Sequence, residues 1–320
     1  DARADRKLRE RIAELPNEKL GDLIRALSCF FDLANLAEDR HRIRVLRHRE
    51  RFLYPAPRSE SMGAAIAALK SKEMDAAQVQ ALLDKLDIEL VFTAHPNEAK
   101  RRTVRRALRR LRNAIVFLES EDLLPRRRER RLHRIRTDLG CLWETESVRP
   151  RKPTGLEEVH RSLFVVESLW EIVPWLYSGL RSALAIQFPH EKFRVPHFLR
   201  FGTWVGGDRD GNPFVTSDVT RRTLTILRET AITRHIQQCD DLIGRLSISV
   251  RRTAMSPQLT KALDEALQRW PDLTSSLEFV HPHERYRHWL AVVRFRLTQT
   301  ATAQSDATLP DGAYDNAEGL

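Results

Sequence analysis

Cysteine is scarce in this chain, and long apolar runs are missing. Cys29, Cys141 and Cys239 stand far apart, with no CxxC pair and no histidine at metal-ligand spacing. This spacing excludes a disulfide framework and is typical of reduced core thiols, so we expect a cytoplasmic protein. No apolar run approaches the ~20 residues that a membrane-spanning helix needs, and we therefore expect no membrane partner.

Lysine is also rare, because only 9 of the 54 basic residues are lysines and the rest are arginines. The net charge of +10 and the pI near 9.9 favour anionic partners. Two arginine-rich segments, residues 100–112 and 126–136, fall on expected amphipathic helices with little aromatic interleaving. A solvated helix face explains them better than nucleic-acid binding, so we expect no nucleic-acid partner.

Hydrophobic periodicity predicts a mostly helical chain. Helices are expected over 18–52, 59–68, 76–86, about 97–118, 126–143, 156–180 with a kink at Pro174, and 217–246. Two or three shorter helical stretches are expected beyond Ser256, including 276–300. We expect a helical region over 1–86, strand and helix units with inserted helices over 87–300, and a flexible linker or loop over 301–320.

Two short segments, residues 88–94 and 197–205, are apolar and rich in strand-forming residues. Each leads into polar residues and then a helix. Because active sites of α/β proteins gather where strands end and helices follow, we expect two short, buried, parallel strands that carry a site at their carboxyl ends.

The second strand runs into a charged, glycine-rich loop within Phe201 to Thr216. Gly206, Gly207 and Gly211 surround a run of Asp208, Arg209 and Asp210, and Asn212 and Pro213 follow. Glycine lets the backbone approach a ligand closely, which favours a binding loop. A polar surface turn is the alternative. A calcium loop is excluded, because Pro213 and Val219 occupy the positions that need glycine and glutamate.

His95 follows the first strand and is held extended by Pro96. A neutral imidazole there could move a proton or contact an anion, with Arg101 and Arg102 one turn into the next helix to supply positive charge. A helix-capping or core histidine is the alternative.

Two motifs together resemble those of the phosphoenolpyruvate carboxylase family. Val91-Phe-Thr-Ala-His-Pro96 with Arg101-Arg-Thr103 is similar to its histidine motif, and Trp204-Val-Gly-Gly-Asp-Arg-Asp-Gly-Asn-Pro213 to its second hallmark. The likeness extends to Phe30–Arg44, Leu142–Thr145 with the Arg-Pro-Arg-Lys-Pro loop, and Val165–Trp170.

The resemblance implies a lyase that carboxylates phosphoenolpyruvate with bicarbonate and Mg²⁺ to give oxaloacetate and phosphate, through carboxyphosphate and an enolate. It implies a catalytic role for His95 and a place for Trp204 beside the substrate's methylene end. Direct contacts of Arg209, Asp208 or Asp210 with substrate are our own hypothesis. The family fold is a (β/α)₈ TIM-type barrel with many added helices, in an allosteric homotetramer that serves anaplerosis.

The chain departs from the family in length. It resembles only about the family's first third. The family's later features therefore have no counterpart here: its glycine-rich mobile loop, a second catalytic lysine, the Mg²⁺ ligands and the phosphate-binding arginines. No metal ligand is expected in this chain. We therefore expect an N-terminal piece that is inactive alone. Asn97 replaces the usual threonine, and no proline precedes Tyr286. A non-catalytic remnant that binds an anionic metabolite or a sister subunit stays open.

Overall fold

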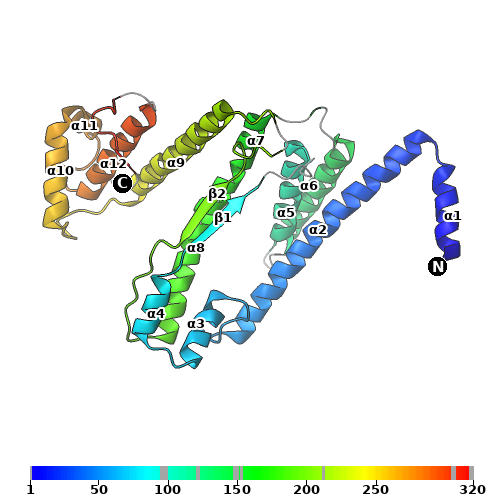
Figure 1. The fold of residues 1–320 in the computed structure, drawn as a ribbon, viewed down its shortest axis with the longest axis horizontal. Coiled ribbons are helices and arrows are strands. Elements are labelled where there is room, and N and C mark those ends of the chain that lie inside the picture. The colour runs from blue at the N-terminus through cyan, green and yellow to red at the C-terminus, as the bar shows by residue number, and fades with distance from the viewer. Residues whose placement is uncertain are drawn as a thin grey trace. The chain divides into compact units, whose positions relative to one another are not determined.

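The chain is mostly helical in a computed structural model (Figure 1). The structure describes residues 2–93, 100–119, 123–146, 151, 154–210, 213–303 and 308–316. It divides into two compact units. Unit 1 comprises Asp1–Pro153 and Leu169–Gly202, and unit 2 comprises Thr154–Ser168 and Thr203–Leu320. The three-part division at residues 86 and 300 stays a prediction.

The helices and strands follow the predicted order. They are α1 (Ala2–Ala13), α2 (Asn17–Leu53), α3 (Met62–Ser71), α4 (Ala76–Leu83), β1 (Ile88–Phe92), α5 (Arg102–Leu118), α6 (Pro125–Glu144), α7 (Gly155–Ser162), α8 (Phe164–Gln187), β2 (Leu199–Thr203), α9 (Ser217–Arg245), α10 (Pro257–Arg269), α11 (Pro271–Ser276) and α12 (Arg285–Thr302). Among the described residues no helix is long and apolar enough to cross a membrane.

Three boundaries differ from prediction. Helix α1 lies within the helical region expected over 1–86 but was not predicted as a separate helix, because its sequence is dominated by charged residues. The single helix expected over 156–180 is α7 and α8, separated at Leu163. At this point the Ser162 hydroxyl donates to the Val159 carbonyl at 2.8 Å. The helix expected from residue 276 begins only at Arg285, since Pro282 disfavours helical backbone before it.

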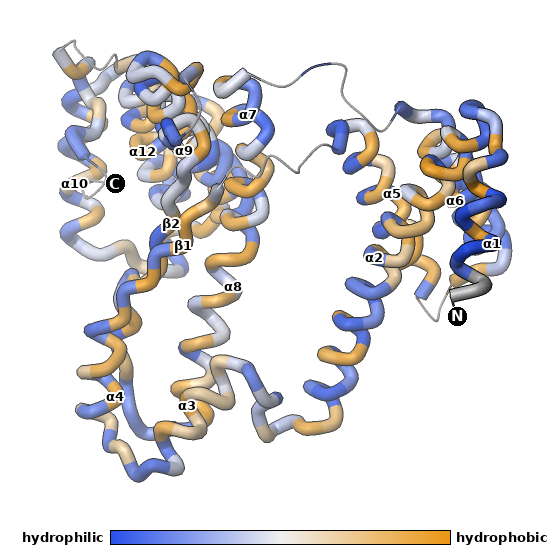
Figure 2. Tube along the Cα trace, turned by 45° about the vertical axis from the view of Figure 1, so that its right-hand side comes forward, coloured by the Kyte–Doolittle hydropathy of each residue, from blue (hydrophilic) through white to orange (hydrophobic). Residues whose placement is uncertain are grey.

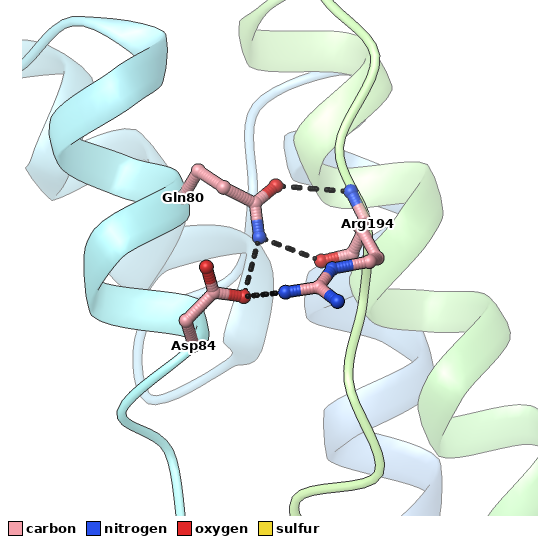
Figure 3. Close-up of polar contacts among 3 residues, drawn as sticks. All are labelled: Gln80, Asp84 and Arg194. Carbon is pink, nitrogen blue, oxygen red and sulfur yellow. Dashed lines mark hydrogen bonds and ion pairs between the residues drawn. The ribbon is translucent and has the colours of Figure 1, made fainter.

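One core of unit 1 lies among α3, α4 and α8, around Val79, Leu83 and Leu184. Gln80 of α4 ties the extended segment before β2 to this core (Figure 3). Its side-chain amide donates to the Arg194 carbonyl and accepts from the Arg194 amide, both at 2.9 Å. Asp84 accepts from the Arg194 guanidinium at 3.1 Å. These bonds satisfy the backbone amide and carbonyl of Arg194, and they hold the segment that leads into β2 in place.

A second core of unit 1 lies where α2 contacts the α5–α6 pair (Figure 2). Leu36, Leu111 and Leu142 are buried there, one from each helix. Ion pairs flank this core: Arg40 with Glu119 at the end of α5, Lys100 with Asp32 before its start, and Arg110 with Asp138 at 2.9 Å. Helix α2 is therefore attached near both ends of α5.

The positive charge of the chain is concentrated on that helix pair. Helices α5 and α6 hold thirteen arginines and three acidic residues, a balance of +10 that equals the net charge of the whole chain. The rest of the sequence is electrically balanced. The predicted solvated face is consistent with exposed side chains such as those of Arg102, Arg109 and Arg127.

The prediction of two short parallel strands is confirmed, but the prediction that they are buried is wrong for β1. The strands β1 and β2 pair with each other in a two-stranded sheet. Leu90 and Val91 of β1 are 50% and 46% exposed, whereas most of β2 is half-buried. Burial of a strand requires packed elements on both sheet faces, and four of the five β1 residues are exposed while Phe92 is half-buried.

Unit 2 is built on α9 and α12, which lie side by side (Figure 1). Ile232 and Cys239 of α9 and Leu297 of α12 form one buried cluster, and Leu263 and Val292 anchor another between α10 and α12. Within the region predicted as linker or loop, residues 308–316 are irregular but packed, because Tyr314 is buried in the first cluster.

Candidate functional site

The loop after β2 is a compact turn around the backbone of Trp204. The Trp204 carbonyl accepts hydrogen bonds from the amides of both Gly207 and Asp208, each at 2.9 Å. On its other side, the Val205 amide donates to the Thr203 hydroxyl at 3.0 Å, and the Val205 side chain is buried. The backbone is thus fixed on both sides of Trp204, while the indole is 56% exposed. A fixed backbone under an exposed aromatic ring suits a binding surface.

Gly206 is the residue at which this turn packs most tightly. Its φ is +78°, in the left-handed region that side chains rarely adopt. A Cβ at this position would collide with the Thr223 hydroxyl of α9 and lie 2.9 Å from Val159 Cγ2 of α7. The Gly206 carbonyl accepts from the Thr220 hydroxyl at 3.0 Å. Glycine is therefore required here by conformation and by space.

The charged part of the loop is exposed. Asp208, Arg209 and Asp210 all face solvent, and the Asp208 carboxylate accepts from the Asp210 amide at 3.0 Å. This local bond shapes the loop. The Arg209 guanidinium has no recorded ion pair within the described part of the chain. Gly211 and Asn212 lie outside the described residues.

His95 also lies outside the described residues, as does the whole segment 94–99. The chain is described again from Lys100, which pairs with the half-buried Asp32 of α2. The Arg101 guanidinium donates to the Glu146 carbonyl at 3.1 Å, and the Glu146 carboxylate lies 3.5 Å from Arg25 of α2. The chain that leaves the histidine segment is therefore anchored to α2 and to the end of α6.

The predicted position of Arg101 and Arg102 one turn into a helix is wrong. Arg101 is the N-cap of α5, with extended backbone at ψ 149°, and Arg102 is its first helical residue. Both arginines thus lie at the positive end of the helix dipole. Arg102 is exposed and Arg101 half-buried.

The predicted loop residues lie together in one unit, and the two predicted arginines belong to the other. Trp204, Gly206, Gly207, Asp208, Arg209 and Asp210 share one loop of unit 2, whereas Arg101 and Arg102 belong to unit 1. The strands that precede these two segments are direct neighbours, and Phe92 stacks on Phe201 with ring centroids 6.2 Å apart. Parallel neighbours bring their carboxyl ends to one edge of the sheet, as predicted.

Sequence reasoning missed three residues that support these segments: Asp32, Thr220 and Thr223. Thr220 and Thr223 follow the loop on α9, where a hydroxyl at i and i+3 is common and carries no signal of its own. Asp32 lies within the Phe30–Arg44 motif, but its partner Lys100 is 68 residues away. Only the folded chain shows these contacts.

Within the described ranges no group of three or more histidine, cysteine, aspartate or glutamate side chains could hold an ion. Mg²⁺ usually keeps several waters and is held by one or two carboxylates together with substrate phosphates, so the exposed carboxylates of Asp208 and Asp210 do not by themselves define a site.

Comparison with known proteins gives a consistent result. A family model described as phosphoenolpyruvate carboxylase matches residues 1–318. A phosphoenolpyruvate carboxylase of Roseiflexus castenholzii is 39% identical over 317 residues, covering 98% of this chain and 34% of that protein. Those of Thermus sp. (strain 71) and Edwardsiella ictaluri are 36% and 35% identical, covering 89% and 91% of this chain. The chain spans about a third of the length of these relatives.

Proposed function

Because the chain belongs to the phosphoenolpyruvate carboxylase family, we propose that it forms part of an enzyme that carboxylates phosphoenolpyruvate with bicarbonate. The products are oxaloacetate and inorganic phosphate. The observation that carries this proposal is the family match over residues 1–318, together with the compact turn that follows Trp204.

The proposed reaction has two stages. A bicarbonate oxygen attacks the phosphoryl group, the bond between phosphorus and the enol oxygen breaks, and carboxyphosphate and an enolate form. Carboxyphosphate then releases CO₂ and phosphate, and the enolate carbon attacks CO₂. Negative charge moves between oxygens throughout, so fixed positive groups and proton donors stabilise the transition states.

We assign roles to residues of this chain accordingly. His95 is proposed as catalytic, holding or moving a proton at carboxyphosphate. Trp204 lines the pocket for the methylene end of the substrate, and Arg101, Arg102 and Arg209 contact its anionic groups. Gly206, Gly207, Asp208, Asp210 and Asn212 support the loop that presents Trp204 and Arg209. Arginine suits these contacts because its planar guanidinium can donate two hydrogen bonds to one carboxylate or phosphate.

Other parts of the proposal concern the longer protein. We propose that strands β1 and β2 are the first two of a (β/α)₈ barrel, and that the remaining strands come from outside these 320 residues. Mg²⁺ supplies positive charge to the substrate oxygens when it is bound, and its ligands belong to that remainder. A cytoplasmic, allosteric homotetramer with an anaplerotic role completes the proposal, and the isolated chain is expected to be inactive.

The test is oxaloacetate formation by the purified longer protein, followed through a coupled reductase with and without bicarbonate and Mg²⁺. Bicarbonate labelled with ¹⁸O should transfer one labelled oxygen to inorganic phosphate, which simple hydrolysis of phosphoenolpyruvate would not do. Absence of both turnover and label transfer would refute the carboxylase proposal and favour a non-catalytic remnant.

A further inference from the structure

We propose that Thr220 of α9 is a positioning residue for the substrate pocket, acting through the Gly206 carbonyl on the backbone of Trp204. This inference rests on the proposed function for its kinetic consequence. Its structural basis, the bond of 3.0 Å from the Thr220 hydroxyl to the Gly206 carbonyl, is independent of that function.

The Thr220 hydroxyl has one proton and two acceptors within reach. One is the Gly206 carbonyl, and the other is the Thr216 carbonyl of its own helix at 3.3 Å. A threonine in a helix ordinarily bonds backward along the helix, as Thr225 does to the Arg221 carbonyl at 3.1 Å. The shorter bond of Thr220 leaves the helix and reaches the loop, so this hydroxyl joins two elements.

The bond acts on the residue at which this turn packs against α9. Gly206 adopts the left-handed conformation, and its carbonyl faces α9. The next two amides, those of Gly207 and Asp208, turn back to the Trp204 carbonyl. A change in the orientation of the Gly206 peptide would therefore be transmitted directly to Trp204 and to the charged run that follows.

Packing of the same helix against Gly206 adds to this restraint. Thr223 is 4% exposed, and its hydroxyl donates to the Val219 carbonyl at 2.8 Å, so it has no proton for the loop. It limits how closely the loop can approach, while Thr220 limits how far it can withdraw. Thr220 is thus the polar contact from α9 that the described residues show for this turn.

The experiment compares four forms of the longer protein: wild type, Thr220→Val, Thr220→Ser and Thr225→Val. Valine keeps the shape of threonine and removes the hydroxyl, and serine keeps the hydroxyl. Thr225→Val removes a hydroxyl whose bond, to the Arg221 carbonyl, lies within α9. Hydrogen exchange of the peptide covering residues 204–210 is measured first, because it needs no enzyme activity. We expect faster exchange in Thr220→Val alone.

Kinetics then test the consequence for the pocket. Loss of one neutral hydrogen bond corresponds to roughly a twofold to tenfold effect, so we expect KM for phosphoenolpyruvate to rise by that factor in Thr220→Val. The KM should stay at the wild-type value in Thr220→Ser and Thr225→Val. A merely structural role would lower the amount of active enzyme and leave KM unchanged. Thr220→Ala serves as a second variant if the valine form does not fold.

The exchange rates and the KM values together decide whether Thr220 positions the pocket. Equal exchange rates in Thr220→Val and Thr225→Val would overturn the inference, whatever the activity of the protein. Faster exchange with an unchanged KM would overturn the link to the pocket. If Thr220→Val exchanges faster but the wild-type protein does not carboxylate phosphoenolpyruvate, the structural role of Thr220 is supported and the proposed function is refuted.

Discussion

Gly206 and Thr223 are so close that no side chain fits between them. A Cβ on Gly206 would meet the Thr223 hydroxyl, and the residue is also held at φ +78°. The loop that presents Trp204 thus depends on a glycine for both its conformation and its packing against α9.

Gly206→Ala should therefore destabilise the protein by about 2–5 kcal/mol, the sum of left-handed strain and overpacking. The measurement is thermal or denaturant unfolding. Gly244→Ala is the matched control, because Gly244 lies within α9 and nothing lies within 4 Å of an added Cβ. That control should stabilise the helix by up to about 1 kcal/mol. Equal stability of the two variants would contradict the packing described for Gly206.

The concentration of positive charge on α5 and α6 predicts that removing one arginine stabilises the protein, and that this gain depends on salt. Arg109 has Arg105, Arg106 and Arg112 at helical spacing, and like charges at such spacing repel by about 0.2–0.5 kcal/mol each. Arg109→Gln should therefore stabilise the protein at low ionic strength, and the gain should shrink in 1 M salt, where the Debye length is about 3 Å.

Arg222→Gln in α9 provides a control of opposite sign. Arg222 lies 3.0 Å from Asp218 one turn earlier, so its removal should cost up to about 0.5 kcal/mol at low salt. Thermal unfolding at two salt concentrations measures both variants. Destabilisation by Arg109→Gln at low salt would show that the arginines are compensated within the protein rather than repelling one another.

Asp311 fixes the irregular segment 308–316 against α10. Its carboxylate accepts from the Trp270 indole at 2.8 Å and from the Arg269 guanidinium at 2.6 Å. These two bonds, the indole bond first, lower the pKa of Asp311 below its ordinary value of 3.8. A carboxyl group whose pKa is lowered in the folded state stabilises the folded protein at pH values above its ordinary pKa. This stabilisation is lost as the pH falls through the lowered pKa.

Asp311→Asn should therefore destabilise the protein equally at pH 5 and pH 8, and the difference from wild type should shrink only in acid below pH 3.8. Melting temperatures of both forms across this range test the prediction. A difference that changes between pH 5 and pH 8 would mean that another group controls the segment.

Local sequence patterns predicted most helices and strands correctly, but they did not predict how exposed a strand is or where a helix breaks. The periodicity of Leu20 to Ala34 and the strand formers around Val91 identified α2 and β1, because a helix or strand imprints its period on neighbouring residues. Exposure of β1 could not be predicted, since it depends on what packs against the sheet. The separation of α7 from α8 at Leu163 could not be predicted either, because the apolar spacing over 156–180 also fits an unbroken helix.

The candidate site shows the same limit. Glycine spacing and charge identified the loop from Gly206 to Asp210 as special, but the reason for Gly206 lies in Thr223, 17 positions later in the sequence. Likewise, the contact of Lys100 with Asp32 joins residues that no local pattern connects. The roles assigned to His95, Trp204, Arg101, Arg102 and Arg209 stay predictions.

The most direct measurement is the rate of oxaloacetate formation by the longer protein in which His95 is replaced by asparagine. Loss of a group that moves a proton in the transition state should lower the rate by about 10²–10⁴-fold. His190→Asn, at an exposed position after α8, should keep the wild-type rate. A wild-type rate in His95→Asn would contradict the catalytic role of His95 in this carboxylase.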